Sequence, residues 1–81
     1  MFNLEFTKME NSMKTVTTIE TISRCFYIDY SDETKLFYVS QDEIHRTYRK
    51  TIGEAFAVIM EKYIKNPAVI TKIECNFKEN N

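Results

Sequence analysis

The acidic and aromatic residues between positions 27 and 33 are the first candidates for a recognition surface. Asp29, Asp32 and Glu33 cluster around a short polar segment, with Tyr27 and Tyr30 beside them. Tyrosine is over-represented among interface anchors, and charged groups add electrostatic complementarity. We therefore predict that these five residues bind a partner protein. An ordinary polar turn next to sheet aromatics is the alternative interpretation.

A second candidate surface is basic. His45, Arg46, Arg49 and Lys50 lie close together in the chain, with Tyr48 among them. Arginine makes bidentate hydrogen bonds with phosphate, and such contacts position proteins on nucleic acids. The spacing favours anion or nucleic-acid binding by Arg46, Arg49 and Lys50. The alternative is a solvated helix face.

Residues for catalysis or metal binding are few. The single glycine leaves no glycine-rich loop for phosphates, and one histidine with two separated cysteines gives no zinc set. Asp42 lies one helical turn before His45 and could orient its imidazole, although aspartate is common in the first turn of a helix. Ser40 is interpreted as a helix cap rather than a nucleophile. We expect no enzymatic activity, no metal and no cofactor.

Composition excludes several classes of protein. The chain has 81 residues, 43% of them hydrophobic, which predicts one folded domain over 1–81 rather than a disordered segment. Its 11 basic and 12 acidic residues are too balanced for a non-specific nucleic-acid binder or for an acidic mimic of nucleic acid.

The location of the protein is predicted from what the sequence lacks. The longest uninterrupted apolar run, 55–60, is far shorter than the roughly 20 residues that span a membrane. The amino-terminal residues have no signal-peptide pattern. We therefore expect a cytoplasmic protein, in which Cys25 and Cys75 are reduced thiols.

Alternating apolar residues predict the strands. This pattern favours strands at 2–8, at 15–30 with a bend or bulge near 21–24, at 35–39, and at 69–78. In the last segment the odd-numbered residues are expected to face inward. A turn over 31–34 joins the second and third strands.

One long helix is expected between the third and fourth strands. Ser40 and Glu43 have the spacing of a capping box, and Val39 and Ile44 occupy the two hydrophobic-staple positions around it. The helix would run over 41–65 and stop at Asn66-Pro67. One broad apolar arc would pack on the sheet: Ile44, Tyr48, Thr51, Ile52, Ala55, Phe56, Ile59 and Tyr63.

A narrower stripe on the same helix predicts a possible homodimer interface. It consists of Gly53, Ala57, Met60 and Ile64. A glycine in a helix interior costs about 1 kcal/mol relative to alanine, and close approach of a partner helix would offset that cost. The alternative is that the stripe forms the rim of the protein's own core. The amino-terminal strand, if it lies at the edge of the sheet, could also pair with another chain by strand addition.

Together these elements predict an α+β domain. Its order is β-β-β-α-β, with a three- to four-stranded, mainly antiparallel sheet and one long helix packed on one face. Residues with AT-rich codons are abundant, which suggests a low-GC source such as a phage or mobile element.

The layout from Tyr27 to Phe77 resembles that of small phage-encoded inhibitors, which include antitoxins against host RNase toxins and anti-CRISPR proteins. This resemblance implies a non-enzymatic, stoichiometric inhibitor or regulator that occludes a host protein such as a nuclease. It carries over no functional residue, because no diagnostic motif is shared. The alternative function is a small nucleic-acid-binding regulator that uses the basic patch.

Overall fold

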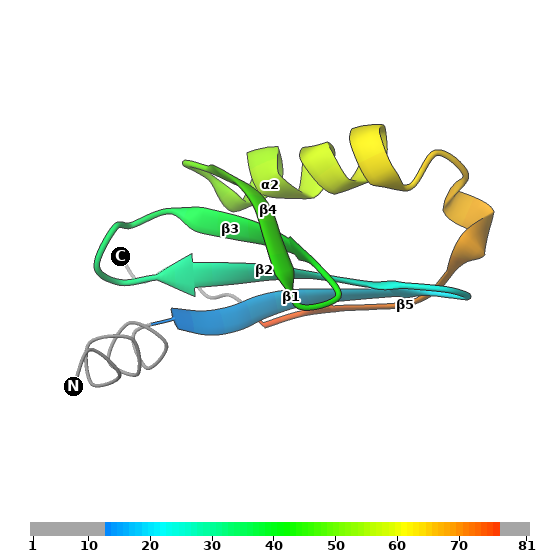
Figure 1. Ribbon diagram of the computed structural model, residues 1–81, viewed down its shortest axis with the longest axis horizontal. Coiled ribbons are helices and arrows are strands. Elements are labelled where there is room, and N and C mark those ends of the chain that lie inside the picture. The colour runs from blue at the N-terminus through cyan, green and yellow to red at the C-terminus, as the bar shows by residue number, and fades with distance from the viewer. Residues whose placement is uncertain (1–12, 77–81) are drawn as a thin grey trace.

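In the computed structural model, which describes residues 13–76, five antiparallel strands form one sheet and a helix covers one of its faces (Figure 1). The elements are β1 (Met13–Thr21), β2 (Cys25–Ser31), β3 (Phe37–Gln41), β4 (Ile44–Arg49), α2 (Ile52–Val58), η1 (Ile59–Tyr63), η2 (Pro67–Val69) and β5 (Ile70–Cys75). The strand order is β4-β3-β2-β1-β5, so the helix carries the chain from one edge of the sheet to the other. The strand predicted at 2–8 lies outside the described residues.

The segment 15–30, expected as one bent strand, instead belongs to two paired strands. The chain reverses at residues 22–24, where the hydroxyl of Thr21 accepts hydrogen bonds from the backbone N–H of Ser23 (3.3 Å) and of Arg24 (2.9 Å). The same hydroxyl donates to the carbonyl oxygen of Arg24. This turn lies where a bend was predicted, and it is sharp enough to begin β2 antiparallel to β1.

Two residues, Asp42 and Glu43, connect β3 to β4. Asp42 has a φ of 57°, in the left-handed region that aspartate tolerates better than most residues. Its backbone N–H donates to the carbonyl of Cys25 (2.7 Å), and its Oδ1 accepts from the backbone N–H of Cys25 (3.2 Å). The turn is therefore fixed to the start of β2.

The predicted helix over 41–65 is wrong, because its first third forms β4 and pairs with β3. The helix begins after Thr51, whose hydroxyl accepts from the backbone N–H of Glu54 (3.1 Å). Ser40, the predicted cap, lies instead in β3. Both Ser40/Glu43 and Thr51/Glu54 have capping-box spacing, and the second pair marks the true start. Over residues 13–76 the fold is thus a five-stranded sheet with one short helix, in the order β-β-β-β-α-β.

The end of the helix lies close to the predicted stop. The last turn widens, since the N–H of Ile64 donates to the carbonyl of Ile59 five residues earlier (2.8 Å). Asn66 then caps η2 through its Oδ1, which accepts from the N–H of Ala68 (3.1 Å), and Pro67 occupies the first position. No helix within residues 13–76 is long and apolar enough to cross a membrane.

The hydrophobic core lies between the sheet and the helix. The strands contribute Val16, Ile19, Phe26, Ile28, Phe37 and Val39, and the helical segment contributes Ala55, Ile59 and Ile64. Ala55 and Ile59 were expected on this face. Ile44 and Tyr48 were also expected there, but they are exposed because they belong to β4.

β5 forms one edge of the sheet. It lies within the predicted strand 69–78, of which residues 77 and 78 fall outside the described part. Two of its odd-numbered residues, Ile73 and Cys75, face the helical side, because Ile73 pairs with Ile19 and Cys75 with Thr17, whereas Thr71 lies at a register shift and is exposed. Ile73 nevertheless remains 48% exposed, since the helix does not extend over this edge. Cys25 and Cys75 are both free cysteines.

Candidate functional site on the open face of the sheet

The face of the sheet that points away from the helix carries polar and aromatic side chains. Strand alternation dictates this arrangement, because Phe26 and Ile28 point into the core and their neighbours must point to the other side. The residues on this open face include Thr15, Tyr27, Asp29, Tyr38, Ser40, His45 and Tyr48.

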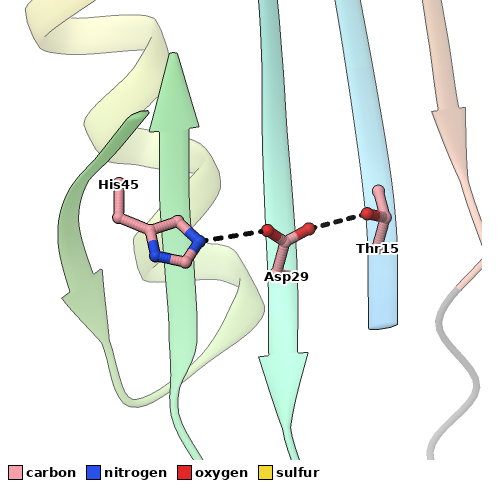
Figure 2. Close-up of polar contacts among 3 residues, drawn as sticks. All are labelled: Thr15, Asp29 and His45. Carbon is pink, nitrogen blue, oxygen red and sulfur yellow. Dashed lines mark hydrogen bonds and ion pairs between the residues drawn. The ribbon is translucent and has the colours of Figure 1, made fainter. Parts of the chain in front are cut away.

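Asp29 lies between two polar neighbours on this face (Figure 2). Its Oδ1 accepts a hydrogen bond of 2.7 Å from the hydroxyl of Thr15. Its Oδ2 lies 3.4 Å from Nε2 of His45, which is an ion pair only when the imidazole is protonated. The Thr15 contact is short, whereas the His45 contact is long. Asp29 therefore keeps acceptor capacity for a better-placed donor.

A pocket of about 280 Å³ lies beside Asp29 on the open face. Among residues 13–76, three carboxylates line it, those of Asp29, Asp42 and Glu43, and His45 is the one lining residue that can carry positive charge. The other lining residues are Thr15, Tyr27 and Ser40. We call this site the acidic pocket. Its charge favours a cationic group over an anionic one.

An aromatic row borders the acidic pocket along β3 and β4. It consists of Tyr38, His45 and Tyr48. The ring of Tyr38 lies with its centroid 5.6 Å from that of His45 and 5.7 Å from that of Tyr48. Tyr48 is 56% exposed. Exposed aromatic faces of this kind attract cations and provide contact area for a partner.

Ser40 lines the pocket, but its hydroxyl oxygen is buried. The residue is 3% exposed, and its Oγ is buried without a hydrogen-bond partner among the described residues. A buried polar group left without a partner costs about 1–3 kcal/mol, so this hydroxyl favours an additional donor or acceptor. Ser40, His45 and Asp29 are the residue types of a catalytic triad. No hydrogen bond links Ser40 to His45 within residues 13–76.

The surroundings of Tyr27 raise the pKa of its phenol. The pKa of Tyr27 is raised above its ordinary value of 10.0, chiefly by hydrogen bonding with the Cys25 side chain and by the negative charge of that sulfur. Burial and the carboxylates of Glu20 and Asp42 act in the same direction. The phenol therefore stays protonated and remains a hydrogen-bond donor beside the acidic pocket.

Of the five residues predicted to bind a partner, the structure brings Tyr27 and Asp29 together in the acidic pocket. Tyr30 lies on the opposite face, where its ring packs against Phe37 with centroids 4.8 Å apart. Asp32 and Glu33 are exposed in the turn between β2 and β3, outside the pocket. Asp32 and Glu33 therefore belong to a different surface from Tyr27 and Asp29.

The pocket residues missed by the sequence analysis are those near β4. Asp42, Glu43 and His45 were assigned to the start of a helix, which would have placed them away from Asp29. The cross-strand pair of Ser40 with His45 brings them to the same face. The signal for that pairing was the second capping box at Thr51, which leaves residues 44–49 for a strand.

The basic residues Arg46, Arg49 and Lys50 lie on and just after β4 rather than on a helix. The guanidinium of Arg49 donates to the hydroxyl of Thr47 (2.9 Å) and to the carbonyl of Tyr48 (2.7 Å). Arg46 and Lys50 are exposed. The edge strand β4 thus carries positive charge next to the aromatic row.

The stripe predicted as a dimer interface is divided by burial. Ile64 is buried in the core, Met60 packs against that core, Ala57 is half-buried and Gly53 is exposed. The interface stays a prediction for this set. Across the described residues, no cluster of three or more histidine, cysteine, aspartate or glutamate side chains could hold a metal ion.

Comparisons with known proteins give no relative for this chain. No protein-family model matches it, and neither a curated protein nor a solved structure matches it. The site is therefore interpreted from the chain's own residues.

Proposed function

We propose that the protein is a non-enzymatic binding module whose open sheet face docks on a basic surface of a partner protein. In this complex an arginine or lysine side chain of the partner occupies the acidic pocket. The observation that carries the proposal is the lining of the pocket, which holds the carboxylates of Asp29, Asp42 and Glu43 and, in the described part of the chain, no lysine or arginine. A cationic side chain would neutralise this concentration of negative charge.

The hydrogen-bonding capacity of the pocket supports the same ligand. Asp29 has a short contact with Thr15 and a long contact with His45, so its Oδ2 can accept a hydrogen bond from a better-placed donor. A guanidinium group offers five N–H donors in a planar fork, and it bonds carboxylates bidentately. Arginine therefore fits this set of acceptors better than a neutral side chain does.

The aromatic row supports a protein partner. The rings of Tyr38 and Tyr48 lie close to the pocket through His45, and Tyr48 exposes more than half of its surface. Arginine stacks on aromatic faces, with a gain of about 0.5–1 kcal/mol at exposed sites. Tyrosine and arginine are also the residue types that most often anchor interfaces.

The class of partner follows from charge. Enzymes that act on nucleic acids hold phosphates with surfaces rich in arginine and lysine, and an acidic face that covers such a surface blocks access to the substrate. We propose that the protein acts as a stoichiometric inhibitor or regulator from a phage or mobile element, with a host nuclease as the target.

A matched pair of variants tests the proposal. Asp42→Asn/Glu43→Gln removes two charges from the pocket, and asparagine at 42 tolerates the left-handed backbone. Asp32→Asn/Glu33→Gln removes two charges from the other exposed turn. The probe is a short oligoarginine peptide, followed by backbone amide chemical shifts of the labelled protein.

We expect the wild type to show peptide-dependent shifts at Tyr27, Asp29 and residues 42–45. The pocket variant should bind at least about tenfold more weakly, because hydrogen bonds to charged groups contribute about 1.5–3 kcal/mol. The control variant should bind nearly as well as the wild type. Equal losses in both variants, or no localised shifts in the wild type, would contradict the proposal.

Nucleic-acid binding through Arg46, Arg49 and Lys50 is the alternative function. The exposed Tyr48 beside this patch favours it, since stacking on aromatic rings supports binding of single strands. A labelled single-stranded RNA then replaces the peptide. Binding that falls steeply with salt and is lost in Arg46→Ala/Lys50→Ala, but not in the pocket variant, would favour this alternative.

A further inference from the structure

The outer edge of β5 is an unpaired edge of the sheet within residues 13–76, because the strand order ends there. Such an edge presents a row of backbone N–H and C=O groups that a further strand can pair with. The sequence of β5 is Ile-Thr-Lys-Ile-Glu-Cys, so opposite charges alternate around one isoleucine. This short segment is therefore close to self-complementary.

The hydrogen bonds between β5 and β1 determine which residues of β5 direct their backbone N–H and C=O groups to the free edge. The N–H of Asn76 donates to the carbonyl of Val16 (2.7 Å), so the backbone groups of Asn76 point toward β1. Successive residues of an antiparallel strand point their backbone groups to opposite sides. Glu74 therefore shares the direction of Asn76, whereas the backbone groups of Ile73 and Cys75 point to the free edge.

We propose that β5 pairs with β5 of a second copy of this chain, antiparallel and with Ile73 opposite Ile73 on the two-fold axis. In this register each Ile73 exchanges both of its backbone hydrogen bonds with its counterpart. Lys72 lies opposite Glu74 of the second copy, and Glu74 lies opposite Lys72. The two sheets join into one continuous sheet.

Charge selects this register over its neighbours. Centring the axis on residue 72 would place two lysines opposite each other, and centring it on residue 74 would place two glutamates opposite each other. Opposite charges directly across an antiparallel pair stabilise it, and like charges destabilise it. Within one chain Lys72 and Glu74 lie 3.8 Å apart, so both charges are already on the same face of the sheet.

The apolar surface beside β5 supports the same arrangement. A groove of about 260 Å³ lies between the start of the helix and β5, and it is formed by Thr17, Ile52, Gly53, Phe56, Ile73 and Cys75. Ile73 is 48% exposed at its outer wall. In the pair, the two Ile73 side chains lie side by side on the helical face and cover each other's exposed surface.

The opposite edge of the sheet does not have this self-complementarity. Within Ile44–Arg49 the charged side chains are those of Arg46 and Arg49, and there is no carboxylate. Pairing of β4 with its own copy would oppose positive charges. The second copy is thus assigned to β5.

Charge exchange tests the register by mass in solution. We expect a species of about twice the 9.7 kDa protomer mass in sedimentation at micromolar to millimolar concentrations. Lys72→Glu alone should shift the protein to monomer, because it opposes Glu74 of the second copy. Glu74→Lys alone should do the same, and the combined variant should restore the dimer.

The combined variant also separates this effect from a local one. Lys72 lies opposite Glu20 within the chain. Lys72→Glu therefore also places two carboxylates, those of residues 20 and 72, opposite each other inside one protomer. That internal conflict persists in the combined variant, and recovery of the dimer then requires the contact between copies. Far-ultraviolet circular dichroism would verify that each variant is folded.

A single cysteine tests the axis. Ile73→Cys in a Cys25→Ser/Cys75→Ser background should oxidise rapidly to a disulfide-linked dimer, because opposing residues of a hydrogen-bonded pair have Cα atoms about 5.5 Å apart. Lys72→Cys in the same background is the control, because it faces Glu74 rather than itself, and it should cross-link slowly. A wild type that remains monomeric at millimolar concentration, or equal cross-linking of both variants, would overturn the proposal.

Discussion

Asp29 of β2 reaches across β3 to His45 of β4, with 3.4 Å between Oδ2 and Nε2. The contact joins strands that are not neighbours in the sheet, and it passes over the β3 residues Tyr38 and Ser40. The side chain of His45 is 49% exposed, compared with 17% for Asp29. Such a contact organises the open face more than it stabilises the fold.

The small energetic weight of this contact can be measured. Exposed pairs of this kind contribute about 0–1 kcal/mol. We expect His45→Ala to lower the free energy of unfolding by less than about 1 kcal/mol in urea denaturation, because Asp29 keeps its bond to Thr15. A much larger loss would show that the imidazole also supports the packing of β4.

The position of the helix start gives a second prediction. Thr51→Ala removes the hydroxyl that accepts from Glu54, and we expect it to lower the free energy of unfolding by about 1 kcal/mol. Ser40→Ala removes a buried hydroxyl without a partner in the described residues, so it should be neutral or stabilising. Urea denaturation of both variants measures the difference. The reverse order would place the cap at Ser40.

Gly53 offers a stabilising substitution. It lies in the first turn of α2, its φ is negative, and a Cβ atom added there meets nothing within 4 Å. We expect Gly53→Ala to raise the free energy of unfolding by about 0.5 kcal/mol, because alanine loses less backbone entropy on folding. Thermal denaturation would measure the gain. Destabilisation would contradict this, because it would mean that other atoms occupy the space beside Gly53 that the Cβ atom needs.

Because the pKa of Tyr27 is raised in the folded protein, the free energy of unfolding should fall with increasing pH in the alkaline range. The folded protein holds the phenol proton more tightly than the unfolded chain does. This contribution is therefore complete below the ordinary pKa of 10.0 and is lost as the pH rises through the folded pKa. We expect Cys25→Ala to lower the pKa of Tyr27, measured by tyrosinate absorbance on alkaline titration. Cys75→Ala, which changes the other thiol, should leave this titration unaltered.

The sequence predicted the α+β class and the alternation of β5, because both depend on local patterns of apolar residues. It failed where two local signals competed. Ser40 and Thr51 each begin a capping-box spacing, and the first was taken as the helix start. Pairing of residues 44–49 with β3 decides between them, and that pairing is a tertiary contact that no local pattern contains.

The candidate site was predicted only in part for the same reason. Tyr27 and Asp29 alternate with core residues of a recognisable strand, so their shared face could be read from the sequence. Asp42, Glu43 and His45 reach that face only because the chain reverses between β3 and β4. The turn depends on a left-handed backbone at Asp42. Aspartate tolerates this conformation, but its presence in the sequence does not predict it.

The order of the strands has a consequence for how the chain assembles. β1 to β4 are neighbours in sequence as well as in the sheet, so each strand can pair with the previous one after a short loop. β5 must instead find β1 across more than 45 residues of intervening chain, after the helix has crossed the sheet. We expect β1 to β4 to form early and β5 to dock last, so that the amide protons of Lys72 and Glu74, which point toward β1, should exchange with solvent sooner in the monomer than those of β2 at the centre.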